Sequence, residues 1–227
     1  MKTLILSDIH GNFPALSAIL EEEKHYDVCL FLGDVVDYGP FPNECIAFLQ
    51  REMDFGVIGN HDNALAYAVD CGCRGEFKRY STETRAWHKN LIGKSELAFL
   101  RSLQPLNHVT IDGNSLVLAH ASPQGDLFRS LLEKEIDEVL DGITAQIVFL
   151  GHTHVQYRKH VGDKLVVNPG SVGLPRNGGQ ACYAILEGGA VTLKRLPYDV
   201  EETIRALAQS PISQESKEGL SRVLRGE

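Results

Sequence analysis

The stretch LILSDIHGN, residues 4–12, ends a short apolar run with an aspartate and a histidine two positions apart. The run LIL suits a strand that is buried on both faces. In an extended chain, side chains two positions apart point to the same side, so Asp8 and His10 can be directed at one centre. Gly11 allows a tight turn directly after them. The stretch therefore predicts a buried strand with two metal-ligand side chains at its carboxyl end.

Four later apolar runs end in a similar way. CLFLG, GVIG, LVLA and VFLG precede further ligand-type side chains, and the five runs together give this set: Asp8, His10, Asp34, Asn60, His120, His152 and His154. The last two share the spacing of the first two, so each pair is expected to serve one centre. A single histidine at a strand end is usually a hydrogen-bonded core residue, but seven ligand-type residues at five strand ends favour a metal site. The set exceeds the needs of one ion and suits two adjacent ions bridged by one carboxylate.

Short apolar runs alternate with amphipathic segments over the N-terminal part, which is the pattern of an α/β fold. Beyond Pro105 the pattern changes to strands that pair around glycine-containing turns, at 112–114, 162–163 and 188–189. A helix is predicted at residues 130–141.

We expect a single domain over residues 1–227, because domains average roughly 100 to 200 residues. A helical insertion is predicted at about 63–103. The segment at about 200–227 is predicted to be a polar helical tail that is loosely attached.

The composition argues against several classes of protein. Hydrophobic residues make up 43% of the chain, but no apolar run is long enough to cross a bilayer, so no membrane segment is expected. The net charge of −8 argues against non-specific binding to nucleic acid, which requires clustered Lys and Arg. The start MKTLILSDIH lacks the features of a secretory leader, which favours a cytoplasmic protein.

The five cysteines show no disulfide pattern and are expected to remain thiols: Cys29, Cys45, Cys71, Cys73 and Cys182. Cys71 and Cys73 could pair or hold a metal ion, but the sequence has no second matching pair. A loop without a metal is therefore the favoured interpretation of DCGCRG.

The order D-x-H, G-D, G-N-H-D, H and G-H-x-H, present here as SDIHG, GDVVD, GNHD, LAHAS and GHTH, resembles the calcineurin-like metallophosphoesterase superfamily. The match runs from Asp8 to about Arg176. NPGSVGLPR at 168–176 looks like the small prokaryotic phosphodiesterase branch and its diadenosine tetraphosphatase-like relatives. The resemblance implies a four-layer αββα sandwich, in which two facing mixed β-sheets are flanked by helices.

The resemblance also implies a role for each matching residue. Asp34 would bridge two divalent ions, and a water between them would lose its proton and attack phosphorus in line. His61 would be the general acid for the leaving oxygen, oriented by Asp37. The ligands suit Mn, Fe, Ni or Zn, of which we expect Mn to support activity in vitro. The two ligand sets would be Asp8, His10 and His154 for one ion and Asn60, His120 and His152 for the other.

One position departs from the Ser/Thr protein phosphatases of this superfamily. They carry arginine directly after the aspartate that corresponds to Asp37, whereas Tyr38 stands here, which argues against protein phosphatase activity. Arg176 is the candidate to contact phosphate instead, with a solvated surface role as the alternative. Asn12 could contact substrate or could cap the helix that follows it.

We therefore expect a hydrolase: a dinuclear metal-dependent phosphoesterase for a small phosphodiester, phosphomonoester or nucleotide-type substrate. A diadenosine polyphosphate hydrolase is the alternative within the same class. A non-catalytic scaffold is the alternative from another class, as in the retromer subunit that shares this fold but lacks the catalytic histidine. The presence of His61 favours an enzyme.

Overall fold

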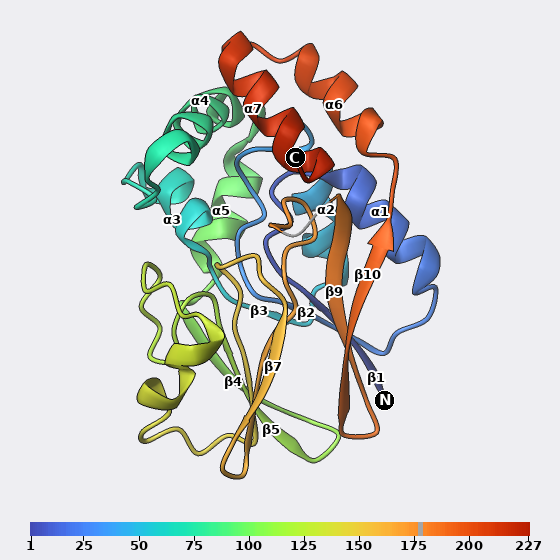
Figure 1. Ribbon diagram of the computed structural model, residues 1–227, viewed down its shortest axis with the longest axis vertical. Coiled ribbons are helices and arrows are strands. Elements are labelled where there is room, and N and C mark those ends of the chain that lie inside the picture. Colours follow the sequence, from blue (N-terminus) through green and yellow to red (C-terminus); the bar gives the residue numbers. More distant parts are fainter. Residues whose placement is uncertain (177–178) are drawn as a thin grey trace.

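Two five-stranded β-sheets face each other and helices lie on the outside (Figure 1), as expected for the αββα sandwich. The structure is a computed structural model that describes residues 1–176 and 179–227. The first sheet has the order β10 (Ala190–Pro197), β9 (Gln180–Glu187), β1 (Lys2–Leu6), β2 (Val28–Phe31) and β3 (Phe55–Gly56). The second has the order β4 (Leu106–Ile111), β5 (Asn114–Ala119), β6 (Ile147–Phe149), β8 (Lys164–Asn168) and β7 (Tyr157–Val161).

Both sheets are mixed, with a parallel centre. In the first sheet β1, β2 and β3 run parallel to one another, and β9 is antiparallel to both of its neighbours, β1 and β10. In the second sheet β5, β6 and β8 run parallel, and the edge strands β4 and β7 are antiparallel to their neighbours. The three expected hairpins join β4 to β5, β7 to β8 and β9 to β10. The carboxyl ends of the parallel strands therefore collect at one edge of each sheet.

The apolar run of β1 is buried on both faces, as its sequence predicts. Ile5 belongs to the core between the two sheets, where it is joined by Leu30 and by Phe149 of the opposite sheet. Leu4 and Leu6 point the other way, into the core beneath the helices. This alternation follows from the two-residue period of a strand.

Helices cover the outer face of the first sheet (Figure 1). They are α1 (Phe13–Glu22), α2 (Pro42–Glu52), α3 (Asn60–Tyr67) and α5 (Lys94–Ser102). A further helix, α4 (Gly75–Leu91), packs on α2 and α3. Together α3, α4 and α5 contain most of the segment predicted as a helical insertion. Within residues 1–176 and 179–227, no helix is both long and apolar enough to cross a membrane.

The helix predicted at residues 130–141 is present, but it is shorter and is not an α-helix. This part of the outer layer on the second sheet contains a short 3₁₀ helix, η1 (Glu133–Val139). Its buried residues Ile136 and Val139 are three positions apart, which suits the three-residue turn of a 3₁₀ helix. An α-helix here would also bring Glu133 next to Asp137, and like charges four positions apart destabilise an α-helix.

The prediction of a loosely attached tail is wrong. The C-terminal segment forms α6 (Val200–Ala208) and α7 (Gln214–Arg225), which pack on each other and against α1 and α4. Leu207, Leu220 and Leu224 are buried in one cluster with Tyr38 and Tyr80. A narrow apolar stripe is enough to dock an otherwise polar helix, so the polar composition of the segment was misleading.

Candidate metal centre

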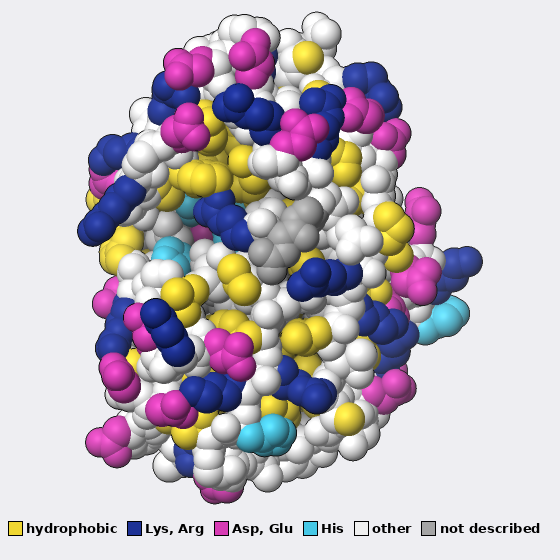
Figure 2. Space-filling model, viewed as in Figure 1, with side chains coloured by type: hydrophobic (Ala, Val, Ile, Leu, Met, Phe, Trp, Pro, Cys, Tyr) yellow, Lys and Arg dark blue, Asp and Glu magenta, His cyan; other side chains and the backbone are white. Residues whose placement is uncertain are grey.

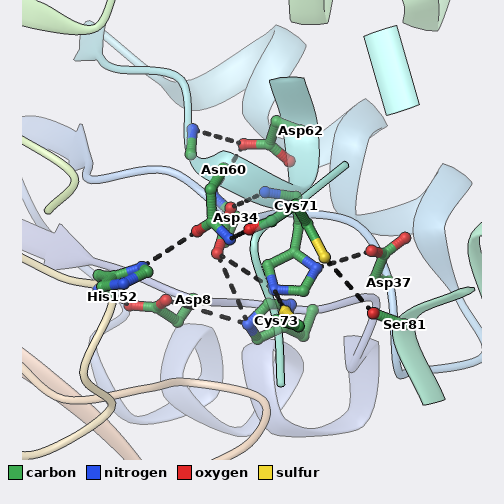
Figure 3. Close-up of polar contacts among 12 residues, drawn as sticks. Asp8, Asp34, Asp37, Asn60, Asp62, Cys71, Cys73, Ser81 and His152 are labelled. Carbon is green, nitrogen blue, oxygen red and sulfur yellow. Dashed lines mark hydrogen bonds and ion pairs between the residues drawn. The ribbon is translucent and has the colours of Figure 1, made fainter. Parts of the chain in front are cut away.

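All seven predicted ligand side chains lie together in the structure. They follow β1, β2, β5 and β6 or begin α3, so elements of both sheets contribute, as Figure 3 shows for Asp8, Asp34, Asn60 and His152. The candidate ligand atoms form two adjacent groups.

The first group contains Asp8, His10 and His154. Nε2 of His154 lies 3.2 Å from Oδ1 of Asp8 and 3.1 Å from Nε2 of His10. All three residues are buried, and their ligand atoms lie within 4.8 Å of one another. Among residues 1–176 and 179–227, none donates a hydrogen bond to Oδ1 of Asp8, although this oxygen is fully buried.

The second group contains Asp34, Asn60, His120 and His152. Oδ1 of Asn60 lies 2.9 Å from Nε2 of His120 and 3.1 Å from Nδ1 of His152. Oδ2 of Asp34 lies 3.1 Å from Nε2 of His120. The same Asp34 oxygen is 4.0 Å from Nε2 of His10 in the first group. Asp34 therefore stands between the two groups.

Backbone carbonyls fix the orientation of three imidazoles. Nδ1 of His10 lies 2.8 Å from the carbonyl oxygen of Val36, and Nδ1 of His154 lies 2.7 Å from that of Leu174. Nδ1 of His120 lies 2.8 Å from the carbonyl oxygen of Leu32. A carbonyl only accepts, so each Nδ1 donates its proton and each Nε2 faces the group. Histidines that bind metals are commonly held in this way.

The ionisation of the groups suits a cation. Burial lowers the pKa of His10 to about 3 and the pKa of His152 to about 4. Burial opposes ionisation of Asp8, but the nearby His154 outweighs it and lowers the pKa of Asp8 to about 2. Near neutral pH Asp8 is thus a carboxylate and the imidazoles of His10 and His152 are neutral. Burial opposes the charged form of His120, but the carboxylate of Asp34 outweighs it and raises the pKa of His120 to about 9, so a bound cation would have to displace that proton. An unpaired buried carboxylate oxygen beside imidazole nitrogens is a donor set that fits a divalent ion.

The backbone conformation that brings these residues together differs from the extended chain expected from the sequence. Asp8 and His10 have φ angles of 53° and 47°, so they lie in left-handed turns beyond the end of β1 and not in extended chain. His152 and His154 also have positive φ, at 66° and 59°, and they fall in different groups. The expectation that each pair serves one centre is wrong for the second pair. Left-handed conformations at residues other than glycine cost energy and are typical of functional sites.

Asp62 is a site residue that the sequence analysis missed. Its buried carboxylate accepts hydrogen bonds from the backbone N–H groups of Asp34 at 2.7 Å and Val35 at 2.9 Å. It also accepts one at 3.2 Å from Gly59, the residue before α3. An acidic residue three positions after a helix cap is the sequence signal that could have identified it. Asp62 fixes the turn that presents Asp34.

His61 and Asp37 lie beside the second group. Nδ1 of His61 donates a 2.7 Å hydrogen bond to Oδ2 of Asp37, so its Nε2 faces the cavity, 4.0 Å from Oδ2 of Asp34. Burial opposes the charged form of His61, but the carboxylates of Asp34 and Asp37 outweigh it and raise the pKa of His61 to about 9. Arg85 of α4 forms an ion pair with Asp37, a contact that the sequence did not indicate.

The metal groups form the floor of a pocket of about 280 Å³. Figure 2 shows histidine side chains in a hollow between hydrophobic and basic side chains. The walls include Phe77, Phe128 and the basic residues Arg74 and Arg176. The guanidinium carbon of Arg176 lies 3.9 Å from the centre of the Phe77 ring. A bound anion with an apolar substituent could contact both the basic and the aromatic side chains of the walls.

Asn12 lies outside this lining. Its Oδ1 accepts a hydrogen bond from the N–H of Ala15 and therefore caps α1. The same oxygen accepts from the hydroxyl of Thr203, while Nδ2 donates to the carbonyl of Gly173 and to the hydroxyl of Tyr198. The side chain is buried and fully used by these contacts. Of the two roles considered for Asn12, the structure shows the helix cap.

Comparison with known proteins agrees with the resemblance seen in the motifs. The chain is 29% identical to an uncharacterized protein of Methanocaldococcus jannaschii, over 91% of each chain. It is 26% identical to Phosphodiesterase YfcE of Escherichia coli, over 85% of this chain and 91% of that one. A metallophosphoesterase structure from Sphaerobacter thermophilus superposes with a TM-score of 0.83 and 28% identity, covering 97% of this chain and 98% of the other. The sequence profile of the Calcineurin-like phosphoesterase superfamily domain matches residues 1–189, and the chain belongs to this superfamily.

Proposed function

We propose that the protein is a dinuclear metal-dependent phosphoesterase that hydrolyses a phosphodiester or phosphomonoester of nucleotide type. The observation that supports this most directly is the position of Asp34, whose Oδ2 lies 3.1 Å from Nε2 of His120 and 4.0 Å from Nε2 of His10. One carboxylate within reach of both groups is what two adjacent ions require. Asp8, His10 and His154 would hold one ion, and Asn60, His120 and His152 the other, with Asp34 shared.

Two divalent ions at this position would supply a deprotonated water as nucleophile and positive charge for the phosphoryl oxygens. The rest of the chemistry belongs to residues of the chain. Nε2 of His61 faces the same cavity and would donate a proton to the leaving oxygen. Asp37 holds the His61 ring through Nδ1 and favours its protonated form. Arg85 keeps Asp37 ionised, because its positive charge adds to that of His61 in lowering the pKa of Asp37 against the effect of burial.

The pocket walls indicate the class of substrate. Arg176 and Arg74 would bind phosphate oxygens, and guanidinium groups suit such contacts. The exposed ring of Phe128 offers a flat apolar surface for a nucleobase or another ring on the ester, while Phe77 supports the guanidinium of Arg176. Tyr38 occupies the position where the protein phosphatases of the superfamily carry arginine, which supports a small substrate over a phosphoprotein.

A substrate panel tests this proposal. Metal-free protein would be reconstituted with Mn²⁺ and assayed on mono- and bis-(p-nitrophenyl) phosphate and on diadenosine tetraphosphate. Hydrolysis that falls by roughly 10²–10⁴-fold in His61→Asn would support an enzyme with His61 as proton donor. Preferred cleavage of diadenosine tetraphosphate would establish the alternative of a diadenosine polyphosphate hydrolase. Absence of hydrolysis across the panel in fully metal-loaded protein would favour the scaffold alternative.

A further inference from the structure

The loop between α3 and α4 places two thiols beside His61. Nε2 of His61 and the sulfur atoms of Cys71 and Cys73 all lie within 4.8 Å of one another. Sγ of Cys73 is 3.3 Å from Nε2 of His61. The sequence offered no partner for the Cys-Gly-Cys segment, because it contains no second cysteine pair. The fold supplies that partner as His61, next to the two cysteines that Figure 3 labels.

The backbone of the loop is built to turn both sulfurs inward. Gly72, between the two cysteines, has a φ angle of +77°, which allows the chain to reverse there. The carboxylate of Asp70 accepts a 2.7 Å hydrogen bond from the N–H of Gly72, and Nδ2 of Asn60 donates a 2.7 Å bond to the carbonyl oxygen of Cys71. The first bond closes a turn within the loop, and the second anchors the loop to Asn60 of the candidate metal centre.

The spacing of the three atoms suits a tetrahedral ion. With Zn–S bonds of about 2.3 Å and Zn–N bonds of about 2.0 Å, adjacent ligand atoms are roughly 3.5–3.8 Å apart. The distance of 3.3 Å from Cys73 to His61 lies close to this range. The hydroxyl of Tyr38 is 3.5 Å from Sγ of Cys73 and 3.4 Å from Nε2 of His61, which places an oxygen near the fourth position. Among the clusters of candidate ligands in the described residues, the one formed by His61, Cys71 and Cys73 contains sulfur atoms, and it lines the cavity.

We propose that His61, Cys71 and Cys73 form a third metal site, which binds Zn²⁺ or another thiophilic divalent ion and inhibits the phosphoesterase. On binding, the two thiols and Nε2 of the protonated His61 release three protons to solvent, and the ion gains two thiolates and one imidazole nitrogen. Thiolates select such ions, whereas Mn²⁺ prefers the oxygen and nitrogen ligands of the main centre. An ion on Nε2 of His61 removes the nitrogen that would carry the proton for the leaving group. The inhibitory consequence rests on the function proposed above, but the site itself does not.

Cadmium absorption tests the site independently of catalysis. Cd²⁺ would be titrated into Mn²⁺-loaded protein kept reduced with a phosphine, and the ultraviolet thiolate-to-metal charge-transfer band would be recorded. We expect one equivalent of Cd²⁺ to produce the band in the wild type and in Cys182→Ser, whose buried cysteine lies elsewhere. The band should be lost in the double variant Cys71→Ser/Cys73→Ser. An equal band in the double variant, or none in the wild type, would overturn the proposal.

The inhibitory part has its own readout. Zn²⁺ should lower the rate of the Mn²⁺-loaded wild type, and the concentration needed should rise at least about tenfold in the double variant, as expected when ligands are lost. Equal Zn²⁺ sensitivity in both proteins would refute inhibition through this site. If the wild type has no hydrolytic activity, the function proposed above fails while the cadmium band still decides the site. Asp34→Asn, which should abolish hydrolysis, should keep the band.

Discussion

Oδ2 of Asp37 accepts a 2.7 Å hydrogen bond from Nδ1 of His61, and both side chains are buried at the edge of the candidate metal centre. This contact leaves Nε2 of His61 facing the pocket. It also adds a negative charge that, with Asp34, raises the pKa of His61 to about 9 against the opposing effect of burial. Metal ions bound to Asp34 would neutralise its charge. In the metal-loaded enzyme, Asp37 should therefore be the main carboxylate that raises the pKa of His61.

Asp37→Asn should move the alkaline limit of activity to lower pH. A proton donor works in its protonated form, so activity falls as pH rises through its pKa. Removing a neighbouring carboxylate should lower the pKa of His61 by about 1 unit or more. The measurement is the pH profile of kcat/KM for the wild type and the variant, with Asp163→Asn in an exposed hairpin as control. An unshifted alkaline limit in Asp37→Asn would contradict the proposed role.

Asp62→Asn should weaken metal binding although Asp62 is not among the proposed ligands. The wild-type carboxylate accepts hydrogen bonds from the N–H groups of Asp34, Val35 and Gly59, and an amide would accept fewer. We expect the affinity for Mn²⁺ to fall by about 10- to 100-fold, measured by competition with a chelating dye. Glu96→Gln is the matched control, because Glu96 has the equivalent capping position in α5, away from the site. Unchanged affinity in Asp62→Asn would show that the turn does not depend on this carboxylate.

Leu220→Ala should destabilise the whole domain. Leu220 is fully buried where α7 meets Tyr38 and Tyr80, and such truncations cost about 2–5 kcal/mol. Chemical denaturation would measure the free energy of unfolding, with the exposed neighbour Glu218→Ala as control. If α7 were only loosely attached, both variants would unfold with the stability of the wild type.

Glu23 should make stability depend on acid pH. Its buried carboxylate forms ion pairs with Lys2 and Lys194 and accepts a hydrogen bond from Tyr183. Burial acts to raise its pKa, but these partners outweigh burial and lower it from 4.5 to about 2. A lowered folded-state pKa means that the stabilisation is fully present above about pH 4.5 and is lost as pH falls toward 2.

Glu23→Gln should therefore be less stable than the wild type by about 1–2 kcal/mol at pH 7, after allowance for solvent screening. The difference should shrink between pH 4.5 and pH 3. Urea denaturation at several pH values measures it, with the exposed Glu22→Gln as control. A difference that is constant over this range would show that the ionisation of Glu23 is not responsible.

The sequence was sufficient to predict the sheets and the candidate ligand residues that lie together, but not the contacts that hold them. The apolar runs predicted the buried central strands because a strand covered on both faces must be apolar throughout. The motif order indicated where Asp8, His10 and the later ligands stand. It could not indicate the left-handed turns at these residues, and the two-residue spacing alone did not indicate that His152 and His154 fall in different groups, a split that only the family resemblance implied. These features depend on how two sheets meet, which is a long-range property.

The same limit explains the residues that were missed. Arg85 lies 48 positions from Asp37 in the sequence and reaches it only because α4 packs over the site. Cys73 meets His61 through the fold of the loop between α3 and α4. Composition also misjudged the C-terminal helices, since a few leucines at helical spacing dock segments that are polar on average.

The central claim is that Asp34 bridges two metal ions, and electron paramagnetic resonance of Mn²⁺-reconstituted protein tests it most directly. The account predicts two Mn²⁺ ions per chain with an exchange-coupled spectrum in the wild type. In Asp34→Asn it predicts weaker binding and loss of the coupled signal. A single uncoupled ion in the wild type, or a coupled pair that survives in Asp34→Asn, would contradict the account.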